Sequence, residues 1–124
     1  MKDPELKFWT TTPNIFLVAT TESGKIVGCI CYRQINPDTV EMCHLAVDGE
    51  FRNLSIGRKL VQALMDTATE NGYDVLYVAT STAQMSARRL YEKMNFKILP
   101  YNGFGPVKDF LTGKKRCAYK INLK

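Results

Sequence analysis

The first half of the chain alternates short apolar runs with polar turns. Apolar residues dominate positions 15–19, 26–32 and 40–47. The polar stretches between them contain Gly24 in one case and Pro37 in the other, and both residue types are typical of tight turns. Three such runs with short connections predict a three-stranded antiparallel meander.

After residue 47 the spacing of apolar positions becomes helical. Apolar residues recur every three or four positions from 56 to 68, which predicts a helix closed by the turn-forming pair Asn71 and Gly72. The pattern then predicts a strand, a second helix, a short strand, a loop rich in Gly and Pro, and a last strand, at residues 75–79, 85–94, 96–99, 102–113 and 117–123. The first of these strands is almost wholly apolar, as expected of a strand covered on both faces.

These elements predict the order β-β-β-α-β-α-β-β within a single domain that spans residues 1–124. The strands at 40–47 and 75–79 are joined through a helix, and this connection makes strands parallel neighbours. The expected fold is therefore α+β, with a mixed, mostly antiparallel sheet and flanking helices.

Length and composition fit one soluble domain. The chain has 124 residues, of which 45% are hydrophobic and 23% charged. It lacks an apolar run of the roughly 20 residues that span a bilayer, and its N-terminus is too polar for a signal peptide. We therefore expect a cytoplasmic protein, or the soluble part of a longer chain. The four cysteines show no C-x-x-C spacing and His44 is the only histidine, so we expect free thiols and no metal site.

The net charge of +5 has two explanations: ordinary solubility, or attraction to an anionic partner, either a nucleic acid or a phosphorylated cofactor. Nucleic-acid-binding domains interleave aromatic side chains with Lys and Arg. Here the aromatic residues are scattered through the apolar runs, which argues against a nucleic-acid partner.

The segment 47–60 is the strongest candidate for an anion site. A strand ends, a polar loop follows, and a helix begins at about Ser55 or Ile56. The first N–H groups of a helix have no intrahelical partner and attract anions, and Gly57 lets a phosphate approach the backbone closely. Cations surround this point, at Arg52, Arg58 and Lys59. The alternative is an ordinary loop with a serine N-cap and solvated charges.

This segment resembles the acetyl-CoA signature [QR]-x-x-G-x-[GA] of the GNAT superfamily, with Arg52 and Gly57 as its ends. Residues 84–96 resemble the second signature, N-x-x-A-x-x-L-Y-x-x-x-G-F, in the right order and at the right separation. The details are closest to the camello-like subgroup, which includes cysteine-S-conjugate acetyltransferases. The resemblance implies an enzyme that transfers acetyl from acetyl-CoA to a primary amine of a small molecule or peptide. The alternative is a non-catalytic acyl-CoA-binding regulatory module.

The resemblance also implies a cofactor cleft where the third strand and the 75–79 strand splay apart. The pantetheine arm would pair with the backbone at Leu45 and Val47. The residues implied in cofactor binding are Leu45, Val47, Arg52, Asn53, Leu54, Ser55, Ile56, Gly57, Arg58 and Gln84.

The chain departs from the family pattern at four points. Ser55 replaces the middle glycine of the first signature, Gln84 replaces an asparagine, and Asn95 replaces a glycine. The N-terminus before Ile15 is also shorter than in most family members, where further elements help to form the acceptor pocket. A homodimer is one way to complete such a fold.

The resemblance assigns the thiol-protonating role to Tyr91, although this residue also lies on an apolar helical stripe and would fit in a core. Glu41 matches the position of a carboxylate base, on the same strand face as Val47 by simple alternation. His44 is the alternative base, and it falls on the opposite face from Glu41 unless a β-bulge intervenes. A water relay could replace both. The oxyanion partner would be a backbone N–H near Leu45.

Overall fold

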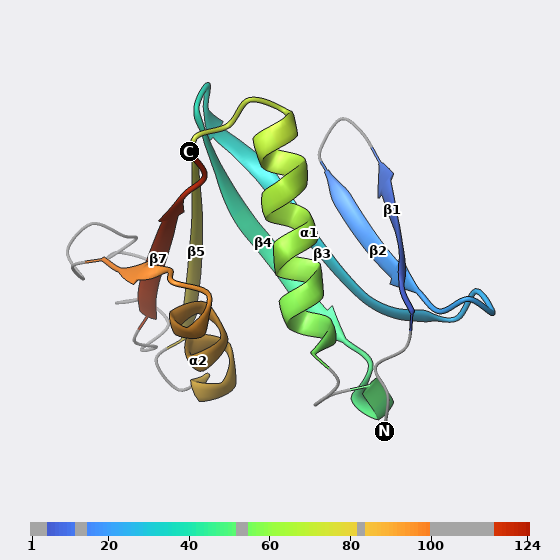
Figure 1. The fold of residues 1–124 in the computed structure, drawn as a ribbon. Coiled ribbons are helices and arrows are strands. Elements are labelled where there is room, and N and C mark those ends of the chain that lie inside the picture. The colour runs from blue at the N-terminus through green and yellow to red at the C-terminus, as the bar shows by residue number, and fades with distance from the viewer. Residues whose placement is uncertain (1–4, 12–14, 52–54, 82–83, 100–115) are drawn as a thin grey trace.

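The computed structural model describes residues 5–11, 15–51, 55–81, 84–99 and 116–124. These residues form a seven-stranded sheet in the order β1-β2-β3-β4-β5-β7-β6 (Figure 1). The strands are β1 (Lys7–Thr11), β2 (Phe16–Thr20), β3 (Ile26–Asn36), β4 (Thr39–Val47), β5 (Val75–Ser81), β6 (Lys97–Ile98) and β7 (Arg116–Asn122). The 3₁₀ turn η1 (Gly49–Phe51) precedes helix α1 (Ile56–Glu70), and helix α2 (Met85–Lys93) follows β5.

The predicted meander, both helices and the parallel pairing of β4 with β5 are confirmed. The other described strand pairs are antiparallel, so the sheet is mixed and mostly antiparallel as expected. Within the described part of the chain, neither helix is long and apolar enough to cross a membrane. The four cysteines are free thiols.

Strand β1 was not predicted. Its side chains do not alternate between buried and exposed positions: the neighbours Phe8 and Trp9 are 38% and 58% exposed. The strand is held by backbone pairing with β2 and by a hydrogen bond of 3.0 Å from Trp9 Nε1 to the Thr20 hydroxyl. Both contacts join residues that are distant in sequence, so a local pattern does not report them.

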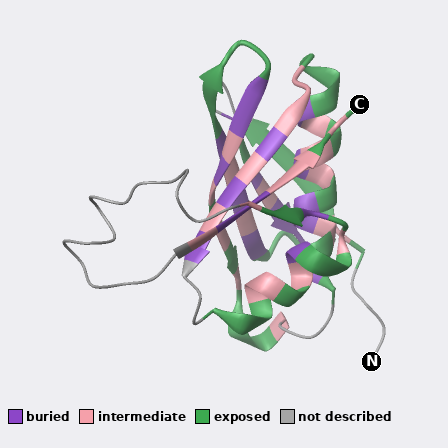
Figure 2. Ribbon diagram, turned by 90° about the vertical axis from the view of Figure 1, so that its left-hand side faces the viewer, coloured by how far each residue is buried: buried purple, intermediate pink, exposed green. Residues whose placement is uncertain are grey.

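Both helices pack on the same face of the sheet (Figure 1). Helix α1 buries one stripe of apolar side chains against β2, β3 and β4: Ile56, Leu60, Val61, Leu64 and Ala68. Figure 2 shows the buried residues on the strands and on the helix sides that face them, while the outer side of α1 is exposed. The helix lies close to the sheet at Gly28, where a Cβ would come within 2.7 Å of Leu60 Cδ1.

Each helix ends in the left-handed turn that its sequence predicts. Gly72 follows α1 with φ +87°, and Asn95 follows α2 with φ +70°. The N–H of Phe96 donates to the Tyr91 carbonyl, and the N–H of Asn95 donates to the Glu92 carbonyl. This is the Schellman pattern, so the asparagine that departs from the family signature fills the role of the usual glycine.

A β-bulge in β4 changes which side chains share a face. Met42 lies opposite Tyr32 and His44 lies opposite Cys31, so Cys43 is an extra residue without a partner on β3. Strand alternation therefore shifts by one position at the bulge. Before it, Met42 points toward the helices and is buried; after it, Leu45 and Val47 point the same way and pack against the core.

The bulge corrects the predicted placement of the candidate bases. Glu41 lies opposite Arg33, on the face of the sheet away from the helices, and not on the face of Val47. Simple alternation fails here because it assumes an unbroken strand. The bulge instead brings His44 onto the same face as Glu41.

The expectation that β5 is covered on both faces is only half met. Leu76 and Val78 are buried beneath the helices, whereas Tyr77 and Ala79 on the opposite face are partly exposed. The apolar composition of β5 therefore overstates its burial.

Candidate active site

The site lies where β4 and β5 separate. The two strands pair from Thr39–Val75 to Met42–Val78. Beyond that point, among the described residues, β4 continues beside β3 and β5 continues beside β7. Backbone polar groups of β4 that face the opening have no neighbouring strand to pair with, and such groups need a partner. The splay that the sequence predicted is thus confirmed, and it begins next to the bulge.

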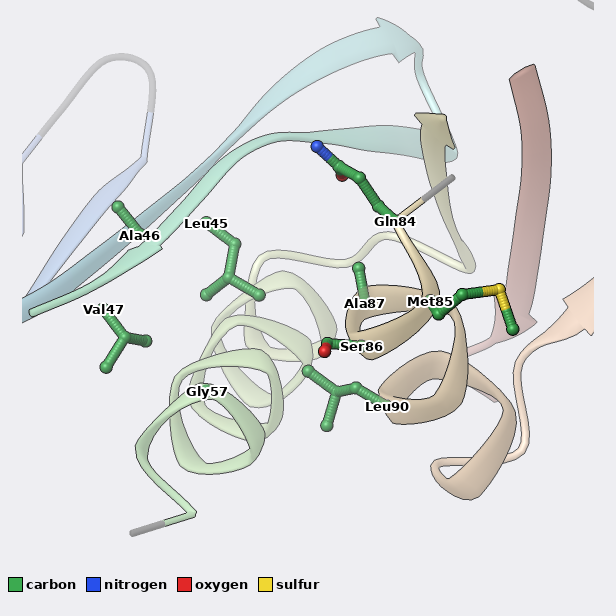
Figure 3. Close-up of a pocket in the computed structure, with 9 residues that line it drawn as sticks. All are labelled: Leu45, Ala46, Val47, Gly57, Gln84, Met85, Ser86, Ala87 and Leu90. Atoms are coloured by element: carbon green, nitrogen blue, oxygen red, sulfur yellow. The ribbon is translucent and has the colours of Figure 1, made fainter. Parts of the chain in front are cut away.

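A cavity of about 690 Å³ occupies this opening. Figure 3 shows Leu45 and Val47 of β4 pointing toward the helices, across from Gly57 of α1 and Leu90 of α2. The volume is in the range of pockets for small molecules and cofactors. Four residues named from the sequence therefore line this cavity: Leu45, Val47, Gly57 and Gln84.

A second cavity of about 620 Å³ adjoins the first. The two share four lining residues, Val47, Gly57, Ser86 and Leu90. The second extends over the start of α1 and along α2, and it adds three cationic side chains: Arg58, Arg89 and Lys93. The combined space is apolar at the β4 end and positively charged at the other end.

The start of α1 presents backbone donors to these cavities. The N–H of Lys59 makes the first intrahelical bond, to the Ser55 carbonyl, so the preceding N–H groups have no partner within the helix. Ser55 occupies the N-cap position, but its hydroxyl makes no capping hydrogen bond. The alternative of an ordinary serine N-cap is therefore not what the structure shows.

Ser55 adopts a left-handed conformation, with φ 62° and ψ 15°. This backbone is costly for residues with a Cβ and free of strain for glycine. This left-handed backbone explains why the family signature has a glycine at its middle position. Ser55 adopts the same conformation at an energetic cost.

The two helix N-termini converge on the first cavity. Gly57 of α1 lies on one side, and residues 84–87 at the start of α2 lie on the other. Each helix N-terminus carries a partial positive charge of about half an elementary charge. Two such ends beside one space make a site for an anion. The first backbone N–H groups of each helix have no partner within the helix and can donate to the anion.

Gly57 is not required by packing. A Cβ at this position would lie 3.7 Å from Leu90 Cδ2 and 3.9 Å from Val47 Cγ2, which is ordinary van der Waals contact. The space beside Gly57 is therefore part of the cavity and would be narrowed by any side chain.

Gln84 is held by a side chain of β5. The Thr80 hydroxyl donates a hydrogen bond of 2.6 Å to Gln84 Oε1. Figure 3 shows the Gln84 amide extending toward β4, and the bond from buried Thr80 leaves its nitrogen available as a donor.

Tyr91 lies beneath the point where the strands part. Its residue is only 4% exposed, and its ring packs against Phe96 and Tyr119 with centroid distances of 5.5 and 5.8 Å. Its hydroxyl lies 3.8 Å from Sδ of Met42, which is a weak acceptor. Met42 is the last residue of β4 that pairs with β5. Burial raises the pKa of Tyr91 to about 12. The structure thus places Tyr91 in the core, and Tyr91 is not among the residues that line the two cavities.

Glu41 is engaged in an ion pair. Arg33 Nη2 lies 2.6 Å and Arg33 Nε 2.7 Å from Glu41 Oε1, and the Glu41 side chain is 16% exposed. The carboxylate raises the pKa of the Arg33 guanidinium through this hydrogen bond. His44 is exposed on the same face. Neither candidate base lines the cavities between β4 and the helices.

Of the remaining candidates, Ile56 is buried and Arg58 lines the second cavity, while Arg52, Asn53 and Leu54 lie outside the described residues. Ser86, Arg89 and Lys93 also line the cavities, although the sequence motifs did not indicate them. Together with Leu90 they are spaced so that they lie on one face of a helix. A helical projection of residues 85–93 would have shown this shared face.

Residues 1–96 match the family model described as "Acetyltransferase (GNAT) family". The chain is similar to N-acetylaspartate synthetase of Danio rerio, with 31% identity over 98 residues, covering 78% of this chain and 34% of that protein. It is also similar to the probable N-acetyltransferase camello of Xenopus tropicalis, with 30% identity over 99 residues, covering 78% of this chain and 45% of that protein. The fold matches an acetyltransferase of Bacillus subtilis solved in complex with CoA, at a TM-score of 0.81 and 15% identity, covering 97% and 100% of the two chains. The chain spans less than half the length of the two sequence relatives.

Proposed function

Since the chain belongs to the GNAT acetyltransferase family, we propose that it transfers the acetyl group of acetyl-CoA to a primary amine of a small molecule or peptide. The observation that carries the proposal is the cavity between the splayed strands, which is lined by residues from the first turns of both helices. A cofactor with an apolar arm and a charged pyrophosphate fits a space that is apolar at one end and cationic at the other.

In this proposal the pantetheine arm lies along Leu45 and Val47, where the edge of β4 lacks a partner strand. The pyrophosphate lies against Gly57 and Arg58, where backbone donors and a cation meet. The Gln84 amide, fixed by Thr80, donates to the arm as it passes. Ser55 and Ile56 shape the start of α1, and Arg52, Asn53 and Leu54 complete the same binding loop in the family signature.

The proposed reaction is direct attack of the amine nitrogen on the thioester carbonyl carbon. The C–S bond breaks, the amine loses a proton to a base, and the thiolate leaves. The bulge at Cys43 turns the backbone of β4 at the mouth of the opening, and an N–H near Leu45 is the proposed donor to the oxyanion.

Tyr91 is the proposed hydrogen-bond donor to the leaving thiolate. Its hydroxyl has only the Met42 sulfur beside it among the described groups, so it gains a better acceptor when a thiolate forms. An alkyl thiol such as that of cysteine has a pKa of about 8.5, so full proton transfer from a phenol of pKa about 12 would cost roughly 5 kcal/mol. A hydrogen bond that strengthens as charge develops on sulfur does not incur this cost.

Glu41 is the proposed base, acting on an amine that reaches the opening from the face away from the helices. There it lies beside Arg33, and an incoming ammonium would take part in the same ion pair. His44 lies on that face too and is the alternative, and a water relay is the third. Glu41→Gln and His44→Gln distinguish them, because loss of the true base removes the acidic limb of the rate profile.

A non-catalytic acyl-CoA-binding module is the second candidate. The pairing of Glu41 with Arg33 favours it, because that carboxylate oxygen is already bonded. Acetyl-CoA binding without turnover of any amine, under conditions where Tyr91→Phe changes nothing, would support this candidate.

The first experiment is a thermal-denaturation titration with acetyl-CoA, using ATP as the polyanion control. Ligand at about a hundred times its Kd adds roughly 2.7 kcal/mol to the stability. For 124 residues this corresponds to a rise in Tm on the order of 10 °C. A rise with acetyl-CoA and none with ATP supports the proposal, and an amine screen follows. No rise at millimolar acetyl-CoA would refute both candidates.

Association of two copies is also part of the proposal. Strand β1 is the first strand of the described sheet and carries the exposed side chains Phe8 and Trp9, and exposed apolar groups at a sheet edge favour pairing with another chain. Light scattering after size-exclusion chromatography tests it, and a monomeric mass at micromolar concentration would contradict it.

A further inference from the structure

The β-bulge brings together two cysteines on the face of the sheet away from the helices. Cys31 of β3 is paired in register with His44 of β4, and Cys43 is the extra residue inserted before His44. In a bulge, two residues of one strand oppose a single residue of the other, so Cys43 and His44 together oppose Cys31. Opposite residues of antiparallel strands have Cα atoms about 4.5–5.5 Å apart, and a disulfide needs about 4.4–6.8 Å. The backbone at the bulge therefore suits a cross-strand disulfide.

The side chains of this pair are also placed for it. The Cys43 thiol is a hydrogen-bonding neighbour of the Cys31 thiol, and both residues are partly exposed. Cys43 Sγ lies 3.5 Å from the Glu41 carbonyl oxygen, a contact that fixes the direction of its side chain. Both cysteines are free thiols. Among the described residues, no group of three His, Cys, Asp or Glu side chains converges, so the two thiols are not part of a metal site there.

The other two cysteines lack this geometry. Cys29 lies two positions before Cys31 on β3, and side chains at that spacing stand about 6.8 Å apart, whereas a disulfide brings the Cβ atoms to about 3.5–4.5 Å. Cys117 is on β7, which is three strands from β3 in the sheet, or at least about 14 Å. Only the pair at the bulge is ready to close without movement of the backbone.

We propose that Cys31 and Cys43 exchange with small disulfides and close to a reversible disulfide across the bulge. The Cys31 thiolate attacks one sulfur of the small disulfide, the S–S bond breaks, and one half leaves as a thiolate. The Cys43 sulfur then attacks the Cys31 sulfur of the mixed disulfide, and the second half leaves. The protein loses two electrons and two protons, and the small disulfide takes them up as two thiols.

The environment of Cys43 sets the order of these steps. Burial, and after it the neighbouring Cys31, raises the pKa of the Cys43 thiol, and the opposing effect of Arg33 is smaller. Cys43 is therefore mostly protonated at neutral pH and reacts slowly with reagents in solution. Its step is the intramolecular one, in which contact with Cys31 supplies a high effective concentration.

The test equilibrates the folded protein with glutathione and glutathione disulfide over a wide range of ratios. Free thiols are then alkylated in denaturant and counted by mass spectrometry. Wild-type protein is expected to change from four alkylated thiols to two at oxidising ratios, with Cys31 linked to Cys43 in the peptide map, and dithiothreitol should restore all four. Cys43→Ser is expected to stop at a glutathione adduct on Cys31. The matched controls, Cys29→Ser and Cys117→Ser, should form the same disulfide as wild-type protein.

Three outcomes would overturn the inference: four free thiols at every ratio, a peptide map that links other cysteines, or a Cys43→Ser variant that still forms an internal disulfide with Cys31. The map of the wild-type protein decides the question without any substitution, so a variant that fails to fold does not leave it open. Thermal denaturation in reducing buffer shows which variants fold. Acetyl-CoA takes no part in this experiment, so its failure leaves the proposed function standing.

Discussion

Gly57 offers a test in which stability and ligand binding are expected to change in opposite directions. The perturbation is Gly57→Ala, which adds one methyl group to the first turn of α1. The nearest atoms to the new Cβ are Leu90 Cδ2 at 3.7 Å and Val47 Cγ2 at 3.9 Å, so the methyl meets ordinary contacts and no clash.

The expected gain in stability comes from the helix itself. Alanine is favoured over glycine in a helix by about 0.8–1 kcal/mol, and somewhat less in the first turn. A gain of about 0.5–1 kcal/mol corresponds to a rise in Tm of roughly 2–5 °C for a domain of this size. Denaturation by heat and by urea, without ligand, measures it.

The expected loss concerns acetyl-CoA. The methyl group projects into the space shared by both cavities, where the pyrophosphate is proposed to approach the backbone. Displacing a phosphate from backbone donors by a few tenths of an ångström costs on the order of 1–3 kcal/mol, or about 5- to 150-fold in Kd. The control is Gly49→Ala, whose Cβ meets nothing within 4 Å and which lines neither cavity.

The reasoning is refuted if Gly57→Ala binds acetyl-CoA as wild-type protein does, because the glycine would then have no role in ligand approach. It is also refuted if the variant is less stable without ligand, because the contacts around Gly57 would then be tighter than the structure gives.

Three further outcomes follow from single positions. Ser55→Gly should exceed Ser55→Ala in stability by about 1 kcal/mol, since both lack the hydroxyl and only glycine relieves the left-handed strain; equal midpoints in urea would contradict this. Gly28→Ala should destabilise by about 1–3 kcal/mol, because its Cβ would lie 2.7 Å from Leu60 Cδ1 and 2.9 Å from the Ala46 carbonyl oxygen; an unchanged Tm would show that α1 shifts freely. The pKa of Tyr91 is raised from 10 to about 12. The protonated hydroxyl therefore makes its full contribution to the free energy of unfolding below pH 10, and this contribution falls by roughly 2–3 kcal/mol as the pH rises toward 12. Tyr91→Phe should therefore lose less stability than wild-type protein over that interval in pH-dependent urea denaturation, and it should lower kcat more than it changes KM; equal alkaline losses would place the hydroxyl in solvent.

The sequence by itself determined the order of the elements from β2 onward and the ends of the helices. Apolar spacing marked α1 and α2, and the residues that close them, Gly72 and Asn95, adopt the predicted left-handed backbone. These features are local: helical spacing and capping involve residues within about five positions of one another. The resemblance to the two signatures also implied the cleft where β4 and β5 separate.

Only the tertiary structure decided which face each candidate residue occupies. The bulge at Cys43 separates Glu41 from Val47 and brings His44 to the face of Glu41, and a bulge depends on pairing with a distant strand. The same holds for β1, which is fixed by its partner strand. The convergence of two helix N-termini on one space, and the cationic stripe on α2 that faces α1, are likewise products of packing. A sequence records which side chains a segment carries; where they meet those of another segment is settled by the fold that joins them.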